Sequence, residues 1–404
     1  MKSPLRFVVV GTLASNPYAG MAWMHMQFTA GLRRLGHDVC YLEATSAWPY
    51  DPVRQSRVCD TDYAVPYLAR VAASFGLGER WAFRASFADN AWSGPLGPKA
   101  EELLATADAV FNVTGSTDLA ALGLRPRRLV LLGTDPVLDE IAYASGDAVR
   151  RAFYDQHHDC LTYGENIGTP RSPLPPLPRL RGRTRQPVLL DLWAAGPPTR
   201  AAFTTVGNWE QSGLDIQFGS ATYRWSKHHE FLKFIDLPRR IPQELELATN
   251  LACGTIQHGA NEAVPAHGVA DDARSLLLRN GWRLRDSREF TTDPWTYRDY
   301  VRASRGEFTV ARDLNVRLRS GWFSERSACY LAAGRPVVTQ DTGFSDVLPT
   351  GEGLFAFTTM DEILAAFDAL RTDYRKHGRA AHAIAEEYFR AETVLGRLLA
   401  DLGY

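Results

Sequence analysis

Short apolar runs alternate with longer amphipathic stretches along the first 168 residues. We expect strands at 5–13, 37–43, 107–115, 127–135 and 158–166. The first of these, LRFVVVGTL, is continuously apolar and rich in β-branched residues, which is typical of a strand buried on both faces of a parallel sheet. Residues 22–35 repeat their apolar positions at helical spacing, and Gly36 is placed to end that helix. Strands that alternate with helices predict a doubly wound α/β domain.

A segment rich in proline and arginine, 169–187, interrupts this rhythm near the middle of the chain. Its prolines predict a linker without regular structure. A second alternating series follows, with apolar runs in 187–193, 202–209, 215–219 and 307–311 and helical patterns in 226–235, 271–282, 293–304, 360–374, 375–389 and 392–402. The sequence therefore predicts two α/β domains, 1–168 and 188–388, that face a central cleft.

Composition narrows the class of protein. The 404 residues carry 45 Lys and Arg against 46 Asp and Glu, and 45% of them are hydrophobic, the balance of a soluble globular protein. A net charge of -1 argues against a general nucleic-acid binder but permits a local basic pocket. No stretch approaches the ~20 apolar residues of a membrane helix. The cysteines show no CxxC spacing, which favours a reduced cytoplasmic location; they are Cys40, Cys59, Cys160, Cys253 and Cys329.

The most informative segment is 304–357. Ser324 stands at the N-cap position of a predicted helix, and Gly334 is placed to end it. A helix that begins there offers free backbone N–H groups and a partial positive charge to an anion. Arg317, Arg319 and Arg326 lie close to this point in the sequence and could neutralise a diphosphate.

This segment resembles the donor-binding half of GT-B glycosyltransferases, in particular the group 1/4-like enzymes. In those enzymes a helix is followed by a turn into a strand, here AAGRPVV at 332–338, and then by a loop with a glycine and an acidic residue, here 341–346. The first 45 residues resemble the GT-B opening more loosely. The resemblance implies a GT-B fold of two Rossmann-like domains, with the last helix, about 389–404, packed back on the N-terminal domain.

The resemblance also implies that the C-terminal domain binds a nucleotide-sugar. The helix start would contact the diphosphate, the following loop would contact the donor sugar or phosphate, and the turn after the first strand of this domain would approach a phosphate. The donor-binding residues expected on these elements are Gly207, Asn208, Arg317, Ser324, Glu325, Arg326, Ser327, Asp341, Thr342, Gly343 and Phe344. Each has a simpler structural alternative as a helix cap, a turn residue or a loop-stabilising group.

Candidate catalytic residues come from the first domain. Asp118 and Asp135 lie near the ends of apolar strands, and His25 lies one turn into the first helix, near the loop where inverting relatives place a histidine. The structural alternatives are helix capping by either aspartate and packing of the histidine against the sheet. The sequence has no HExxH motif and no cysteine cluster at ligand spacing, so we expect no metal and no other cofactor.

The segment departs from the best-known GT-B subfamilies. Retaining enzymes often carry two glutamates eight residues apart, and these positions are Gly321 and Cys329 here. Inverting plant-type enzymes carry a histidine that 320–323 lacks. Retention and inversion therefore both stay open.

Together these patterns predict a metal-independent glycosyltransferase of the hexosyltransferase type. It would move a sugar from a UDP- or dTDP-sugar to a small-molecule or natural-product acceptor in a bacterial cytoplasm, as a monomer or homodimer, with no nucleic-acid partner and no membrane span. The alternatives are a non-catalytic bilobed binding protein and a GT-B sugar-nucleotide epimerase. A nicotinamide oxidoreductase is excluded because Gly11 does not open a GxGxxG motif.

Overall fold

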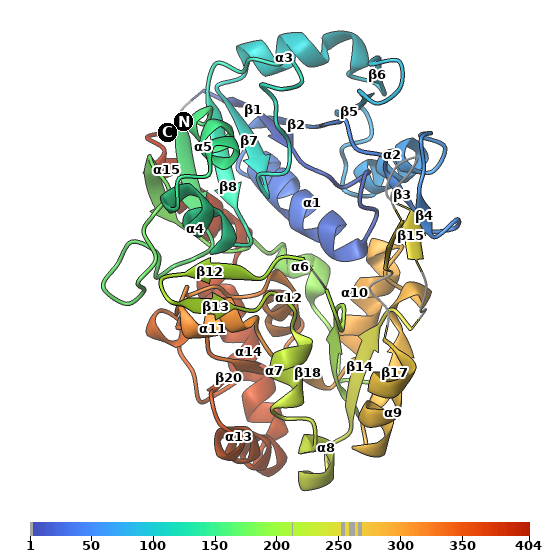
Figure 1. Ribbon diagram of the computed structural model, residues 1–404, viewed down its shortest axis with the longest axis vertical. Coiled ribbons are helices and arrows are strands. Elements are labelled where there is room, and N and C mark those ends of the chain that lie inside the picture. The colour runs from blue at the N-terminus through green and yellow to red at the C-terminus, as the bar shows by residue number, and fades with distance from the viewer. Residues whose placement is uncertain (1–2, 212, 252–254, 258–262, 266–268) are drawn as a thin grey trace.

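The chain forms two lobes, each built on its own sheet (Figure 1). The computed structural model describes residues 3–211, 213–251, 255–257, 263–265 and 269–404, so Cys253 lies outside the described residues. The N-terminal lobe holds an eight-stranded sheet in which every neighbouring pair is parallel except the edge pair β5 and β6. In spatial order its strands are β10 (Leu180–Arg183), β9 (Asp159–Thr162), β8 (Leu129–Gly133), β7 (Ala109–Val113), β1 (Arg6–Val10), β2 (Asp38–Thr45), β5 (Trp81–Ala85) and β6 (Trp92–Ser93).

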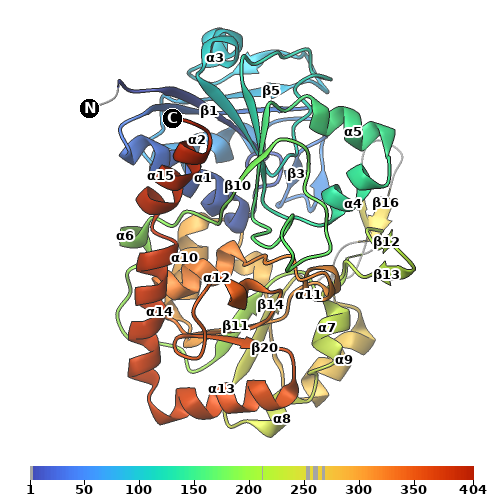
Figure 2. The same ribbon diagram turned by 90° about the vertical axis from the view of Figure 1, so that its left-hand side faces the viewer.

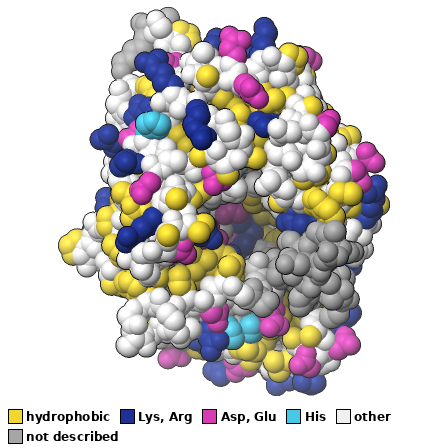
Figure 3. Space-filling model, turned by 45° about the horizontal axis from the view of Figure 1, so that its top comes forward, with side chains coloured by type: hydrophobic (Ala, Val, Ile, Leu, Met, Phe, Trp, Pro, Cys, Tyr) yellow, Lys and Arg dark blue, Asp and Glu magenta, His cyan; other side chains and the backbone are white. Residues whose placement is uncertain are grey.

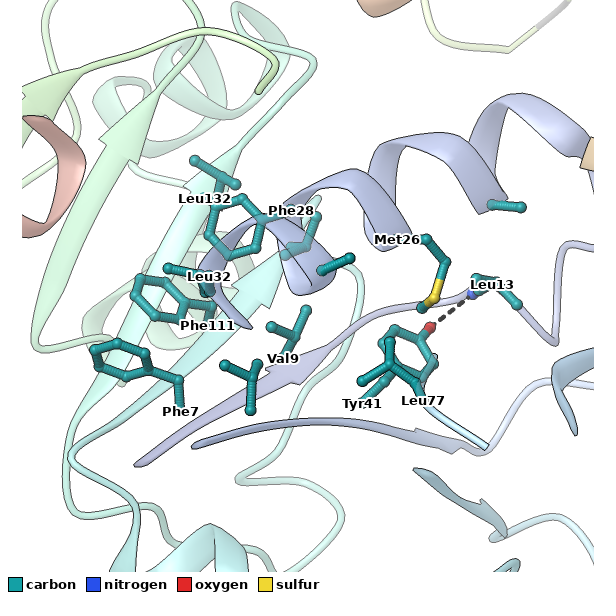
Figure 4. Close-up of a cluster of buried hydrophobic side chains, with 14 of the residues drawn as sticks. Phe7, Val9, Leu13, Met26, Phe28, Leu32, Tyr41, Leu77, Phe111 and Leu132 are labelled. Carbon is teal, nitrogen blue, oxygen red and sulfur yellow. Dashed lines mark hydrogen bonds between the residues drawn. The ribbon is translucent and has the colours of Figure 1, made fainter. Parts of the chain in front are cut away.

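Helices cover both faces of this sheet. They are α1 (Ala19–Arg34), α2 (Ala64–Ser74), α3 (Ala100–Thr106), α4 (Leu138–Ala144) and α5 (Ala148–Asp155), with a small hairpin of β3 (Tyr50–Asp51) and β4 (Ser56–Arg57). On one face Phe28 of α1 packs on Phe111 of β7, with ring centroids 5.2 Å apart (Figure 4). On the other face Val8 and Val10 pack with Leu104 of α3. Because β1 is buried on both faces, it needs the continuous apolar run seen in the sequence.

The C-terminal lobe holds a six-stranded, entirely parallel sheet. In spatial order its strands are β17 (Arg283–Asp286), β14 (Leu245–Thr249), β11 (Phe203–Val206), β18 (Gly306–Thr309), β19 (Val337–Gln340) and β20 (Leu354–Phe357). Its helices are α7 (His228–Leu232), α8 (Leu237–Arg240), α9 (Asp271–Arg279), α10 (Pro294–Ala303), α11 (Asp313–Arg317), α12 (Glu325–Ala332), α13 (Met360–Thr372) and α14 (Tyr374–Tyr388).

Besides β3–β4, two further hairpins lie outside the main sheets. The apolar run 215–219 forms not a sheet strand but β12 (Ile216–Phe218), which pairs antiparallel with β13 (Ala221–Tyr223). The second hairpin joins β15 (Thr255–Gln257) to β16 (Ala263–Pro265). In Figure 1 the β12–β13 hairpin lies where the two lobes meet.

The segment 169–187 is not the unstructured linker that its composition predicts. No proline lies between Pro178 and Pro187, and the residues of β10 in this stretch pair in parallel with β9 at the edge of the first sheet. The chain crosses to the second lobe only after this strand, through α6 (Leu190–Trp193). The prediction that 169–187 lacks regular structure is therefore wrong for residues 180–183, because an edge strand needs only a short stretch free of proline.

The chain returns to the N-terminal lobe beside the first crossing. The Val188 N–H donates to the Phe389 carbonyl at 2.7 Å, and the Ala391 N–H donates to the Val188 carbonyl at 3.0 Å. The final helix, α15 (Ala391–Asp401), then packs against α1 and β10 (Figure 2). A Cβ on Gly31 of α1 would lie only 2.5 Å from Leu395, so glycine allows this close contact.

Candidate active site between the two lobes

Loops at the carboxyl ends of both sheets meet at the boundary between the lobes. After β1, the Ala19 N–H donates to the Thr291 carbonyl of the other lobe at 2.7 Å. After β8, the Thr134 carbonyl accepts a hydrogen bond from Trp322 Nε1 at 2.9 Å. Figure 3 shows a hollow between the lobes with basic and acidic side chains inside it. Ligands of doubly wound folds bind at this end of the strands.

The first turn of α12 lies at this boundary. Ser324 has the extended backbone of an N-cap, with φ −69° and ψ 136°, but its hydroxyl makes no capping hydrogen bond. The first bond inside the helix runs from the Ala328 N–H to the Ser324 carbonyl at 3.1 Å, so the earlier N–H groups have no partner within the helix. A free hydroxyl beside a helix N-terminus favours an anion.

Arg326 is buried beneath this turn rather than free in the cleft. Its Nε lies 2.6 Å from Glu307 of β18, its Nη1 donates to the Val206 carbonyl at 2.5 Å, and its Nη2 donates to Thr309 at 3.1 Å. These partners hold the guanidinium in place. Burial alone would lower the pKa of Arg326, but the Glu307 carboxylate beside it raises that pKa above its usual range. Arg326 therefore contributes a fixed positive charge behind the helix start.

Lys227 supplies a second cation at the same point. It borders a cavity of about 10 Å³ together with Ser324, Arg326 and Thr342. Residues at the carboxyl ends of β18 and β19 line the same cavity. Burial, and then the charges of Arg326 and Arg312, lower the pKa of Lys227 to about 7. Its ammonium makes no salt bridge among the described residues. A cation so placed gains more from an incoming anion than one that already has a carboxylate partner.

The loop after β19 is held by its own side chains. Asp341 accepts hydrogen bonds from the Gly343 N–H at 2.8 Å and from the Ser345 hydroxyl at 2.7 Å. Thr342 donates to the Trp322 carbonyl at 2.5 Å and is buried. Asp341 and Thr342 thus stabilise the loop, and the backbone at Gly343, with φ 90°, adopts a conformation that favours glycine.

Asn166 of the N-terminal lobe forms hydrogen bonds to this loop from the opposite side of the cleft. Its backbone N–H donates to the Ser320 carbonyl at 3.0 Å, and its Nδ2 donates to the Gly343 carbonyl at 3.0 Å and to Asp346 at 3.1 Å. A Cβ on Gly321 or Gly343 would lie within 2.7 Å of Asn166 atoms. The two glycines therefore let Asn166 reach both loops.

Two other predicted donor residues, Phe344 and Ser327, are buried. Phe344 packs against Phe323, with ring centroids 5.1 Å apart, and is 1% exposed. Ser327 is 1% exposed, and its hydroxyl has no hydrogen-bond partner among the described residues. Phe344 nevertheless borders the same cavity as Lys227 and Ser324, whereas Ser327 does not.

Glu325, the first residue of α12, faces the N-terminal lobe. Its Oε1 lies 3.9 Å from the position that a Cβ on Gly20 would take. The side chain is partly exposed, and among the described residues it makes no salt bridge. Glu325 thus offers a carboxylate on the cleft side of the helix start.

Asp135, a predicted base, is bound to an arginine of the opposite lobe. Arg312 follows β18, and its Nη1 lies 2.6 Å from both carboxylate oxygens of Asp135. The guanidinium also stacks on Trp225, 3.6 Å from the ring centroid. In this arrangement Asp135 forms a bridge between the lobes and does not act as a helix cap.

The structure does not place the other two predicted bases in the cleft. His25 is fully buried, with Nδ1 2.8 Å from the Met21 carbonyl, and a Cβ on Gly11 would lie 2.1 Å from its Nε2. Burial lowers the pKa of His25 to about 4. Asp118 is exposed and accepts a hydrogen bond from the Ala121 N–H at 3.0 Å, which is a capping interaction. His25 packs against the sheet and Asp118 stabilises a turn.

Arg317 does not reach the helix start either. Its Nη1 donates to the Thr222 carbonyl at 2.9 Å, and its guanidinium lies 4.2 Å from the Tyr223 ring centroid. It therefore fastens the β12–β13 hairpin. Gly207 follows β11, and a Cβ on it would lie 4.0 Å from Arg326 Nη1, whereas the adjacent Asn208 is exposed.

Other features of the described residues lie apart from this site. A larger cavity of about 790 Å³ opens at the other end of α12, between 194–198 and α14. No group of three or more His, Cys, Asp or Glu side chains in the described part of the chain is arranged to hold a metal ion. No described helix is long and apolar enough to cross a membrane.

Lys227, Arg312 and Asn166 belong to the site but were not among the predicted donor or catalytic residues. Lys227 is one of only five lysines in a chain with 45 basic residues, and it begins a helix after the first strand of its domain. Arg312 directly follows an apolar strand, a position that in hindsight favours a site residue. Asn166 carries no comparable signal, because its partners lie far away in the sequence.

No family model matches the chain, and no curated protein matches it. Solved structures do. An alpha-glucosyltransferase in complex with UDP and a 13-mer DNA is 8% identical, with a TM-score of 0.57 and full coverage of both chains. HepE of Anabaena in complex with UDP-glucose is 13% identical, with a TM-score of 0.55 and 99% coverage of each chain. A glycosyltransferase from Rickettsia africae ESF-5 is 9% identical, with a TM-score of 0.55, and covers 98% of this chain and 97% of its own. The chain therefore has the GT-B fold that its sequence predicts.

Proposed function

We propose that this protein transfers a hexosyl group from a nucleoside diphosphate sugar, with UDP or dTDP as the nucleotide, to an acceptor hydroxyl. The observation that carries the proposal is that Lys227 and the uncapped first turn of α12 border the same cavity. Among the described residues, Lys227 has no salt-bridge partner. A diphosphate supplies the anion that both features favour. UDP or UDP-glucose in two structures of the same fold supports this choice of nucleotide.

The same residues would assist departure of the nucleotide. As the bond to the sugar breaks, negative charge grows on the diphosphate, where Lys227, the Ser324 hydroxyl and the helix N–H groups can stabilise it. The buried pair of Arg326 and Glu307 keeps the helix start rigid while this happens. We therefore propose a reaction in which protein cations take the place of a metal ion at the diphosphate.

We propose a small molecule, such as a natural product, as acceptor. The net charge of -1 supports this over the DNA bound by one structural neighbour, because binding to DNA phosphates relies on an excess of basic residues. The four described cysteines, Cys40, Cys59, Cys160 and Cys329, are all free, which supports a location in the reducing cytoplasm.

Calorimetry with UDP and dTDP tests the donor site. We expect one nucleotide to bind wild type, and Ser324→Ala to weaken it about three- to tenfold, since one hydrogen bond to a charged group is lost. Ser93→Ala, on the strand β6 at the outer edge of the first sheet, is the matched control and should bind like wild type. Hydrolysis or transfer of the bound nucleotide-sugar then separates an enzyme from a binding protein. Absence of binding by every nucleotide would contradict the proposal.

A further inference from the structure

The ion pair between Asp135 and Arg312 lies at the edge of the proposed diphosphate pocket. Val310 and Ala311 border that pocket together with Lys227, and Arg312 is the next residue of the chain. Trp225, on which the Arg312 guanidinium stacks, lies two residues before Lys227. The charge of Arg312 also contributes to the lowered pKa of Lys227, after burial and Arg326. Arg312 is therefore the third cation at this point of the cleft.

Arg312 differs from Arg326 in how firmly its guanidinium is held. Arg326 uses three nitrogens on three partners of its own lobe. Arg312 contacts Asp135 through Nη1 alone, and its Nε is buried with no hydrogen-bond partner in the described part of the chain. Its planar group therefore has donor capacity that a second anion can use.

The partner of Arg312 is also the more hydrated member of the pair. The Asp135 side chain is 40% exposed, whereas that of Arg312 is 14% exposed. A carboxylate that already contacts water loses little when its partner leaves, so the pair is weak enough to exchange. The pocket itself measures only about 10 Å³, so side chains around it must move before a diphosphate enters.

We propose that Arg312 exchanges Asp135 for the donor diphosphate when the nucleotide-sugar binds. This inference rests on the proposed function. A diphosphate carries more charge than a carboxylate and presents several oxygens to the guanidinium fork, so it is the stronger partner once Lys227 and α12 hold it nearby. Asp135 is thus a built-in competitor for the donor, and it lowers donor affinity by occupying Arg312.

The exchange has a consequence for the order of binding. Before the donor arrives, the Asp135 carboxylate is occupied by Arg312. After the exchange it is left on the N-terminal face of the cleft, free to accept a hydrogen bond from an acceptor hydroxyl. Meanwhile the Trp322 bond to the Thr134 carbonyl still joins the two lobes beside it. The acceptor is therefore expected to bind productively after the donor.

Calorimetric titration of UDP into matched variants tests the exchange. Asp135→Asn removes the competing charge and should tighten UDP binding about three- to tenfold, while Arg312→Ala should weaken it by about tenfold or more. The double variant should bind like Arg312→Ala, because no guanidinium remains to be released. Asp191→Asn breaks the Arg34–Asp191 pair of 2.6 Å at a distant surface and should leave UDP affinity unchanged.

The direction in which each variant changes UDP affinity distinguishes the exchange from a purely structural ion pair. A merely structural ion pair would lose affinity in both single variants, so weaker or equal UDP binding by a folded Asp135→Asn protein would overturn the exchange while leaving the donor site intact. Wild-type affinity in Arg312→Ala would overturn it as well. If wild type binds neither UDP nor dTDP, the proposed function fails, and this inference fails with it. Thermal unfolding without ligand verifies that each variant is folded.

Discussion

Among single residues, Lys227 is the one whose charge we expect to set the pH range of nucleotide binding. Its pKa is lowered to about 7, first by burial and then by neighbouring cations, so its ammonium form is present below pH 7 and is lost above it. A bound diphosphate favours the charged form, and binding at higher pH must therefore take up a proton. We expect UDP affinity, measured by calorimetry, to fall by up to about tenfold per pH unit between about pH 7.5 and 9.

Lys227→Arg is the matched control for this pH dependence, because a guanidinium stays charged throughout the range. It should retain UDP binding with a much flatter pH profile, whereas Lys227→Met should lose most of the affinity at every pH. Identical pH slopes in wild type and Lys227→Arg would assign the proton to another group.

Residues near the helix start could be located from the sequence, but their partners could not. Ser324 occupies the predicted N-cap because capping depends on a few adjacent residues. Arg326 lies beside it as expected, yet its charge is fixed by Glu307 and the Val206 carbonyl. Asp135 likewise faces a residue 177 positions away. Such pairings depend on how the strands are ordered in space, which no local pattern reveals.

At the scale of elements, Asn166 positions the loop after β19 through two amide hydrogen bonds. Asn166→Asp keeps the shape of the side chain but places a carboxylate against the Gly343 carbonyl and Asp346. We expect the loop to shift, and kcat/KM with the nucleotide-sugar to fall about tenfold or more. UDP affinity, which we propose depends on Lys227 and α12, should change less than about threefold.

The combination with Asp346→Asn tests the cause of this loss. In the double variant the carboxylate is at position 166 and the amide is at position 346, so a hydrogen bond between the two side chains can form again. Part of the lost kcat/KM should therefore return. A parallel loss of UDP and nucleotide-sugar binding in Asn166→Asp would instead indicate general damage to the lobe interface.

Several strands with long apolar runs were predicted, whereas the edge strand β10 and the buried strand β14 were not. The runs around 5–13 and 127–135 became β1 and β8 because buried strands need apolar residues on both faces. β10 has the sequence LRGR, and its pattern is too polar to indicate a strand that exists by pairing with β9. The run 215–219 became a hairpin because its neighbours, not its own pattern, determine where it pairs.

In the whole molecule, Gln27 joins three parts of the structure. This fully buried side chain of α1 accepts hydrogen bonds from the Leu189 N–H at 3.0 Å and from Trp193 Nε1 at 2.9 Å, and it contacts Cys329 of α12. Gln27→Leu leaves two buried donors without an acceptor. We expect the free energy of unfolding, measured in urea, to fall by about 2–4 kcal/mol.

Gln217→Leu on the exposed β12–β13 hairpin is the control, with an expected change within about 0.5 kcal/mol. If Gln27→Leu is equally mild, the lobes are held together by apolar packing without help from this hydrogen-bond network.

The return of α15 to the first lobe bears on folding during synthesis. The core of the N-terminal lobe includes Leu395, Leu398 and Leu399, which leave the ribosome after the whole C-terminal lobe. All strands of the first sheet are synthesised before those of the second, but the apolar surface that α15 covers stays exposed until the second lobe has been made. In a nascent chain of this protein the core of the N-terminal lobe thus stays incomplete until α15 has been synthesised, after the whole second lobe, the reverse of the usual order in which domains mature.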